Sequence, residues 1–221
     1  MLEVNSIYLF RNKKQIFSNF SLKLKKREII FLFGENGVGK TTLLDIISGL
    51  IRPNKGFVKI YNKEIEEIGT LKKNYLLYLS HKNSIKEGLS VEENIRVWLS
   101  LLEISVKNED FYEKLKIFNL NEVRGNLVKN LSHGQKKKVS LTKLLFSDSK
   151  LWLMDEPFNG LDYKTTKTLK SLMENHTKKN GAVLFTSHFN PNFKSILKIE
   201  LRRKIEKKKI QGSFDSWEKL K

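Results

Sequence analysis

A glycine-rich octapeptide at residues 34–41, GENGVGKT, constrains the fold of this chain more than any other feature. It follows a continuous apolar run at residues 29–33, which is typical of a strand buried on both faces. It opens a helical pattern over residues 40–48 that Gly49 can end. This strand, loop and helix match the pattern G-x-x-x-x-G-K-[ST], in which backbone N–H groups point inward at phosphate oxygens. The sequence therefore predicts a nucleotide-binding site.

Within this loop, both side chains and backbone amides would bind the nucleotide. The Lys40 ammonium would place a charge on the β- and γ-phosphates, and the Thr41 hydroxyl would bind Mg²⁺. We expect the nucleotide to be contacted by Gly34, Glu35, Asn36, Gly37, Val38, Gly39, Lys40, Thr41 and Thr42. The expected cofactors are ATP and Mg²⁺.

A second apolar strand, at residues 151–154, ends in the two carboxylates Asp155 and Glu156. Asp155 would hold Mg²⁺ through water, opposite Thr41, and Glu156 would orient or deprotonate the attacking water. Phosphoryl transfer suits such a pair, because it depends mostly on positioning and charge neutralisation. Alone, the pattern also fits an ordinary strand followed by a polar turn. Together with the phosphate loop it predicts hydrolysis.

The hydrophobic pattern of the whole chain alternates strands with helices. Further strands are predicted at residues 57–61, 76–79 and 182–186, and further helices at residues 135–146 and 163–176. Near the N-terminus, alternate apolar residues predict half-buried antiparallel strands: Leu2, Val4, Tyr8, Phe20, Leu22 and Leu24. Buried strands separated by helices indicate an α/β fold with a parallel central sheet.

A helical stretch between residues 91 and 130 interrupts this alternation, so we interpret it as part of an inserted helical subdomain. We predict a single domain over residues 1–221. About residues 1–80 and 147–221 would form the core with its antiparallel part. About residues 81–146 would form the helical subdomain.

Composition limits the partners that this chain can have. It contains no Cys, which excludes disulfides and Cys-based zinc sites, and its apolar runs are far shorter than the roughly 18 residues of a membrane span. The net charge of +18 would suit a nucleic acid or a membrane surface. However, Lys, Asn, Ile and Phe are all frequent and have AT-rich codons, so genome composition explains much of the Lys excess.

A basic tail has two interpretations. Its cations are Arg202, Arg203, Lys204, Lys207, Lys208 and Lys209. They would lie against anionic headgroups, or they would protect a solvated strand edge from aggregation. We prefer the strand edge.

Three more segments resemble motifs of the ABC ATPases. LSHGQ at residues 131–135 resembles their LSGGQ signature, NGLD at residues 159–162 their D-loop, and TSH at residues 186–188 their switch histidine. All the motifs stand in the order of that family, over essentially the whole chain. The resemblance implies a P-loop NTPase fold with a RecA-like parallel core, an N-terminal antiparallel β subdomain and an inserted helical subdomain. It also implies Mg-dependent ATP hydrolysis coupled to transport.

The same resemblance implies a site that two copies of the chain share. In the family, the signature of one subunit meets the γ-phosphate bound by the other, which makes a head-to-tail homodimer with two sites. The nucleotide would thus also be contacted by Ser132, His133, Gly134, Gln135 and Asp162. The catalytic groups would be Lys40, Glu156 and His188. Taken singly, Ser132 fits a plain helix cap, and His188 fits a structural or surface histidine.

Three positions depart from the family pattern. His81 stands where most members have a glutamine that touches Mg²⁺ or water and couples to the membrane subunit. It would belong to the metal site, or it is a surface residue in a loop. Arg11 occupies the place of the aromatic residue that stacks on adenine, and a guanidinium can also stack there. His133 replaces a smaller residue and adds bulk near the phosphate.

His81 and its surroundings, LYLSHKNSIK at residues 77–86, resemble one subfamily, the CcmA ATPases of cytochrome c maturation, or haem export. This implies a CcmB-like integral membrane subunit and other cytochrome c maturation proteins as partners, without direct contact to haem or nucleic acid. The chain would be peripheral, on the cytoplasmic face of a bacterial inner membrane or the matrix side of an organelle inner membrane. The alternatives are the ATPase of another ABC exporter or importer, and a soluble ABC ATPase acting on ribosomes or nucleic acid.

Overall fold

The computed structural model describes residues 1–11, 14–69, 72–81, 84–193 and 195–202. The basic tail from residue 203 onward lies outside the described residues, so both interpretations of it stay open. Arg202, the last described residue, is exposed and pairs with Glu200.

A five-stranded parallel sheet forms the centre of the molecule, in the order β6-β7-β8-β3-β9. The strands are β3 (Ile29–Phe33), β6 (Leu76–Leu79), β7 (Leu151–Met154), β8 (Ala182–Thr186) and β9 (Leu197–Glu200). The first four have the bounds that their apolar runs predict, because both faces of these strands are covered. β9 is an edge strand of largely exposed residues and gave no apolar signal.

The N-terminal sheet is antiparallel, in the order β2-β1-β4-β5. Its strands are β1 (Leu2–Arg11), β2 (Lys14–Leu24), β4 (Lys55–Ile60) and β5 (Lys63–Glu64). The predicted strand is present, but its alternation does not run through to Tyr8: the pairing of β1 shifts after Val4, and Ser6 takes a φ of 47°. This irregularity turns Ile7 and Leu9 into the core and leaves Tyr8 half-buried.

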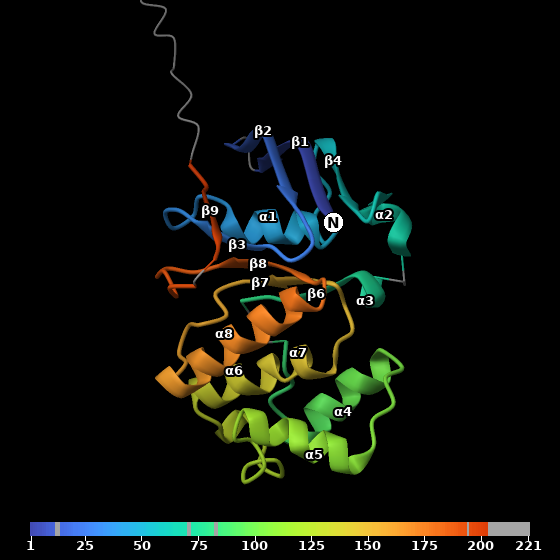
Figure 1. Cartoon of the computed structure of the whole chain (residues 1–221), viewed down its shortest axis with the longest axis vertical. Coiled ribbons are helices and arrows are strands. Elements are labelled where there is room, and N and C mark those ends of the chain that lie inside the picture. Colours follow the sequence, from blue (N-terminus) through green and yellow to red (C-terminus); the bar gives the residue numbers. More distant parts are fainter. Residues whose placement is uncertain (12–13, 70–71, 82–83, 194, 203–221) are drawn as a thin grey trace, which may run out of the picture.

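The elements stack in layers (Figure 1). Helix α1 (Lys40–Ile47) lies between the two sheets, and the helices α4 to α8 cover the other face of the parallel sheet. Two hydrophobic clusters match these layers: one joins α1 to both sheets, and the other joins the parallel sheet to the helices below it. Because both clusters include strands of the parallel sheet, that sheet is the common support of the molecule.

The helices below the sheet are α4 (Val91–Leu101), α5 (Asn108–Ile117), α6 (His133–Leu141), α7 (Lys143–Phe146) and α8 (Tyr163–Lys178). Short helices α2 (Ile65–Ile68), α3 (Lys72–Tyr75) and η2 (Val128–Asn130) lie in the connections. Nothing in the part of the chain that the structure describes forms a helix both long enough and apolar enough to span a bilayer.

Two helix predictions differ from the structure in detail. The stretch at residues 91–130 is not one continuous helix: α4 ends at Leu101, α5 starts at Asn108, and the short η2 follows at its end. The helix predicted at residues 135–146 starts two residues earlier, capped by Ser132, and is interrupted at Thr142, which separates α6 from α7. The proposed division into core and helical subdomain stays a prediction.

Candidate nucleotide-binding site

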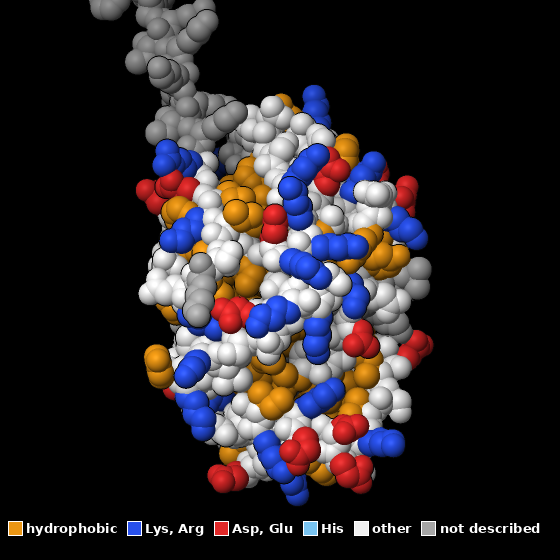
Figure 2. Space-filling model, viewed as in Figure 1, with side chains coloured by type: hydrophobic (Ala, Val, Ile, Leu, Met, Phe, Trp, Pro, Cys, Tyr) orange, Lys and Arg blue, Asp and Glu red, His pale blue; other side chains and the backbone are white. Residues whose placement is uncertain are grey.

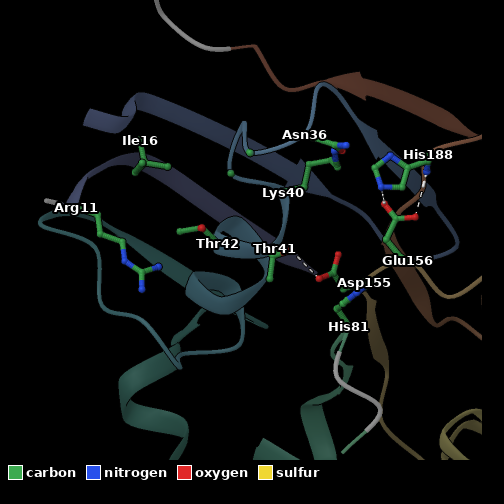
Figure 3. Close-up of a pocket in the computed structure, with 12 residues that line it drawn as sticks. Arg11, Ile16, Asn36, Lys40, Thr41, Thr42, His81, Asp155, Glu156 and His188 are labelled. Carbon is green, nitrogen blue, oxygen red and sulfur yellow. Dashed lines mark hydrogen bonds and ion pairs between the residues drawn. The ribbon is translucent and has the colours of Figure 1, made fainter. Parts of the chain in front are cut away.

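A pocket of about 330 Å³ lies where the phosphate loop meets the carboxyl ends of the parallel strands. It is lined by Arg11, Ile16, Asn36, Gly37, Gly39, Lys40, Thr41, Thr42, His81, Asp155, Glu156 and His188 (Figure 3). The loop follows β3, and the acidic pair follows β7. In open parallel sheets, ligands bind at this edge.

The phosphate loop presents donors to the pocket. The buried Lys40 ammonium donates to the carbonyl oxygens of Gly34 at 2.7 Å and Glu35 at 3.1 Å. Helix α1 starts after Gly39 without a side-chain cap, so its first N–H groups can bind an anion. Gly39 has a φ of 112°, and an added Cβ would lie 3.0 Å from Ile16. Only glycine fits this turn without strain.

Three residues of the phosphate loop, Gly34, Glu35 and Val38, do not line this pocket. Gly34 and Glu35 line a neighbouring pocket of about 450 Å³, and the side chain of Val38 is buried in the core. A contact between these three residues and the nucleotide therefore stays a prediction.

Asp155 is held between two hydroxyl groups. Its carboxylate, which is 2 % exposed, accepts hydrogen bonds from Thr41 Oγ1 and Thr186 Oγ1, each at 2.7 Å. The bond to Thr41 brings together two groups that lie 114 residues apart in the sequence. Both are oxygen donors, as Mg²⁺ prefers, and Mg²⁺ commonly takes only one or two protein ligands beside phosphates and water. The donor chemistry therefore fits Mg²⁺.

Glu156 is buried beside His188. The His188 backbone N–H donates to Glu156 Oε2 at 3.1 Å, and His188 Nε2 lies 3.4 Å from Glu156 Oε1. Burial raises the pKa of Glu156, and the nearby His188 opposes this effect. The imidazole itself is half-exposed at the pocket mouth. The arrangement places a carboxylate that can accept a proton next to the phosphate loop.

His81 and Arg11 both line the pocket, at different ends. In Figure 3, His81 lies beside Asp155, and Arg11 lies with Ile16 near the far end of the loop. An imidazole nitrogen is a poor direct ligand for Mg²⁺, which favours oxygen. Phe10, next to Arg11 in the sequence, is 52 % exposed and does not line the pocket.

The signature segment lies outside this pocket. The Ser132 hydroxyl accepts from the Gln135 backbone N–H at 3.2 Å, and the Gln135 side chain accepts from the Ser132 N–H at 2.9 Å. Together they form a capping box at the start of α6, so Ser132 is a helix cap in the single chain. None of the four signature residues, nor Asp162, lines the 330 Å³ pocket.

The structure joins the signature, and the helix α6 that it begins, to the D-loop. The Lys138 ammonium donates to the Asp162 carboxylate at 2.8 Å, while the other oxygen of Asp162 caps α8 through the Thr165 N–H at 2.7 Å. These bonds hold the pKa of Asp162 far below its usual value. A Cβ on Gly134 would lie 2.8 Å from the Gly160 carbonyl, so the two loops touch.

Sequence reasoning missed two residues at the site. Ile16 lines the pocket from β2, and its half-buried position gave no functional signal. Thr186 belongs to the TSH motif at residues 186–188, but the sequence predicted no role for it. However, its hydroxyl contacts both acidic residues. A hydroxyl residue at the end of a buried apolar strand, next to the strand that carries Asp155, was the available signal.

A phosphate loop, an acidic strand end and a capped signature helix on this α/β fold define the ATP-hydrolysing cassettes, and a family model described as "ABC transporter" matches residues 17–159. The chain belongs to this family, and so it binds and hydrolyses ATP. Within the family it is similar to the "Cytochrome c biogenesis ATP-binding export protein CcmA" of Vibrio parahaemolyticus. The two are 34% identical over 188 residues, which are 85% of this chain and 92% of that protein.

One further curated relative and one solved structure also match most of the chain. The CcmA protein of Dechloromonas aromatica is 32% identical over 202 residues, which cover 91% of this chain and 99% of that protein. A solved structure of a dimeric bacterial ABC transporter cassette has a TM-score of 0.79 and 22% identity, and covers 92% of this chain and 97% of that chain. At this identity the solved structure supports the fold alone.

Proposed function

We propose that this chain is the ATPase subunit of an ABC exporter for cytochrome c biogenesis, of the CcmA type. The observation that carries the ATPase part is the joining of Thr41, Asp155, Glu156 and His188 in one pocket with Lys40. The relatives named CcmA, which match most of the chain, support the particular transporter.

In this proposal the triphosphate enters along the phosphate loop. Lys40 exchanges its two carbonyl contacts for oxygens of the β- and γ-phosphates, and the first N–H groups of α1 bind the same phosphates. Mg²⁺, held by Thr41 and Asp155, would neutralise charge on the phosphates. His81, which lines the same pocket, would hold a water molecule of this centre, because an imidazole nitrogen is a poor direct ligand for Mg²⁺.

Glu156 acts on the attacking water. Its buried carboxylate has a raised pKa, which makes it a better proton acceptor than an exposed glutamate. His188 holds one carboxylate oxygen with its backbone N–H and faces the other with its ring. The half-exposed ring of His188 then contacts the γ-phosphate, and Arg11 stacks on the base at the far end of the pocket.

A second copy of the chain completes the site. The signature residues and Asp162 lie outside the pocket of their own chain. A head-to-tail dimer brings Ser132 and Gln135 of one copy to the γ-phosphate held by the other, where the start of α6 presents its N–H groups. Two solved structures of one cassette with this fold are described as dimeric. The dimer works on a CcmB-like membrane subunit, at the cytoplasmic face of the membrane or the matrix side in an organelle.

Glu156→Gln tests the catalytic assignment. This change removes the proton acceptor and keeps the shape, so turnover falls by at least about 100-fold while ATP binding persists. ATPase rates and ATP binding of the purified chain are the measurements. Hydrolysis at the wild-type rate would show that Glu156 is not the catalytic carboxylate.

A pull-down from detergent-solubilised membranes, with mass spectrometry of the bound proteins, tests the transporter assignment. We expect a small multi-span subunit together with other cytochrome c maturation proteins. A permease of another kind would contradict the assignment and leave the ATPase role intact.

The charge of +18 raises nucleic acid as a competing partner. On the face that Figure 2 shows, however, Lys and Arg side chains are spread among acidic ones and do not gather into one patch. A nucleic-acid site usually concentrates such cations on one face or stripe. Salt-dependent binding of RNA or DNA at physiological ionic strength would favour the competing function.

A further inference from the structure

The hydroxyl group of Thr186 links the two acidic residues that follow β7. Thr186 ends β8 and is fully buried. Its Oγ1 donates to Asp155 Oδ1 at 2.7 Å and accepts from the Glu156 backbone N–H at 2.9 Å. A backbone N–H can only donate, so the hydroxyl accepts there and gives its single proton to the Asp155 carboxylate.

We infer that Thr186 is a positioning residue for ATP hydrolysis, which orients the Asp155 carboxylate and holds the backbone of Glu156. The inference rests on the roles proposed above for Asp155 and Glu156. Thr186 itself lines none of the described pockets, so it acts through these two neighbours and not on the nucleotide.

The backbone of Glu156 needs such support. Its φ of 49° lies in the left-handed region, which side chains other than glycine, asparagine and aspartate rarely adopt. A strained conformation of this kind persists only where the surroundings hold it in place. The bond from the Glu156 N–H to Thr186 is one such support. It fixes the peptide from which the carboxylate reaches the backbone N–H of His188.

Thr186 is well placed to serve as this fixed point. Met154, the residue before Asp155, pairs with Phe185, the residue before Thr186, so the two groups leave neighbouring parallel strands side by side. On its other side, Thr186 pairs with Leu32 of β3, the strand that leads into the phosphate loop. Thr41, the second hydroxyl on Asp155, belongs to that loop and is assigned to Mg²⁺. Thr186 is therefore the partner that stays with Asp155 throughout the reaction.

Thr186→Val tests the inference, because valine keeps the shape and removes the hydroxyl. We expect kcat to fall by about 10- to 100-fold, as is usual when the partner that orients an active-site ligand is lost. The Kd for ATP should stay within about threefold, since Lys40 and the loop amides bind the phosphates. If Thr186 had a merely structural role, its substitution would not lower kcat and leave the Kd for ATP nearly unchanged. A folded Thr186→Val chain with wild-type kcat would overturn the inference.

A second pair of variants covers the case in which valine prevents folding. Thr186→Ser and Thr186→Ala both lose the methyl group and differ only in the hydroxyl. We expect the serine variant to keep kcat within about threefold of the wild type and the alanine variant to show the 10- to 100-fold loss. Equal rates for the two variants would overturn the inference, because the methyl group and not the hydroxyl would then matter.

Two controls complete the design. Thr177→Val removes another buried hydroxyl, which donates to the Glu174 carbonyl at 2.8 Å within α8, and it should leave kcat unchanged. Glu156→Gln distinguishes a failure of the role inferred for Thr186 from a failure of the catalytic role proposed for Glu156. If Glu156→Gln abolishes turnover while Thr186→Val and Thr186→Ala leave it intact, only the role of Thr186 fails. If Glu156→Gln turns over normally, the proposed catalytic assignment fails instead.

Discussion

At the scale of single residues, the contact between the signature and the D-loop depends on glycine. Gly160 has a φ of 74°, and a Cβ there would lie 2.6 Å from His133 Nδ1. His133 therefore packs against the D-loop, in addition to the bulk that it brings to the signature. This contact couples the shape of the two loops that the proposed dimer would present to the second nucleotide.

Gly160→Ala is expected to destabilise the chain. The left-handed conformation alone costs about 1–2 kcal/mol for a residue with a Cβ, and the contact with His133 adds to it. His133→Gly should relieve only the contact, so the double variant is expected to recover part of the loss. Urea unfolding of the single and double variants measures both effects. Equal stability of Gly160→Ala and the wild type would contradict the expectation.

At the scale of elements, helix α8 packs on β7 through a half-buried histidine. The His176 ring stacks on Trp152, with 3.8 Å between ring centroids, and its Nε2 lies 3.1 Å from the Lys150 carbonyl oxygen. Burial lowers the pKa of His176 from 6.5 to about 4. The folded chain therefore holds this ring neutral at pH values where the unfolded chain protonates it.

Stability should consequently fall as the pH drops from about 6.5 to about 4 and should lose nothing further from this group below that range. The sign follows because the unfolded state binds more protons than the folded state within this window. His176→Gln removes the titrating group and keeps an N–H donor for the Lys150 carbonyl oxygen. We expect urea unfolding at pH 7 and pH 5 to show a smaller difference for this variant than for the wild type.

His81→Gln is the control for this experiment, since it removes an exposed histidine and leaves the packing of α8 unchanged. Its stability should depend on pH as the wild type does. The same pH dependence in His176→Gln and the wild type would show that the His176 ring does not contribute.

At the scale of the whole molecule, the parallel sheet carries two separate surfaces of the proposed site. The pocket with Lys40 opens at the carboxyl ends of the strands, while Ser132 lies at the start of α6, among the helices on one side of the sheet (Figure 1). Because one chain does not bring these two groups into a common pocket, the proposed site needs two chains.

A mixing experiment tests this two-chain site. Lys40→Ala and Ser132→Arg should each abolish ATPase activity, since each damages both sites of a homodimer. A mixture of the two variants should regain partial activity, because a mixed dimer has one undamaged site and one site with both defects. Steady-state ATPase assays of the mixture, in the presence of the membrane partner where turnover requires it, are the measurement.

The matched control mixes Lys40→Ala with the double variant Lys40→Ala and Ser132→Arg. Every site in that mixture lacks Lys40, so no activity should return. The absence of recovery in the first mixture, with dimers shown to form, would contradict a site shared between chains.

Local sequence determined much of the fold and pointed to many of the residues that line the pocket. Continuous apolar runs located four strands of the parallel sheet, because strands covered on both faces need apolar residues at every position. The phosphate loop was readable since glycine, lysine and threonine must follow one another in a single turn. The edge strand β9 and the shift that buries Ile7 were not readable, since an exposed strand and a local irregularity leave no periodic signal.

Only the tertiary structure decided how distant groups meet. The sequence proposed separate tasks for Asp155 and Glu156, but the hydroxyl of Thr186 that contacts both comes from another strand, 31 residues beyond Asp155. The signature motif likewise predicted Ser132 as a nucleotide contact. In the single chain, however, the Ser132 side chain caps α6 and does not line the pocket. The physical reason is the same in both cases. A motif fixes the chemistry of a segment, but the pairing of strands and the packing of helices fix which segments share a site.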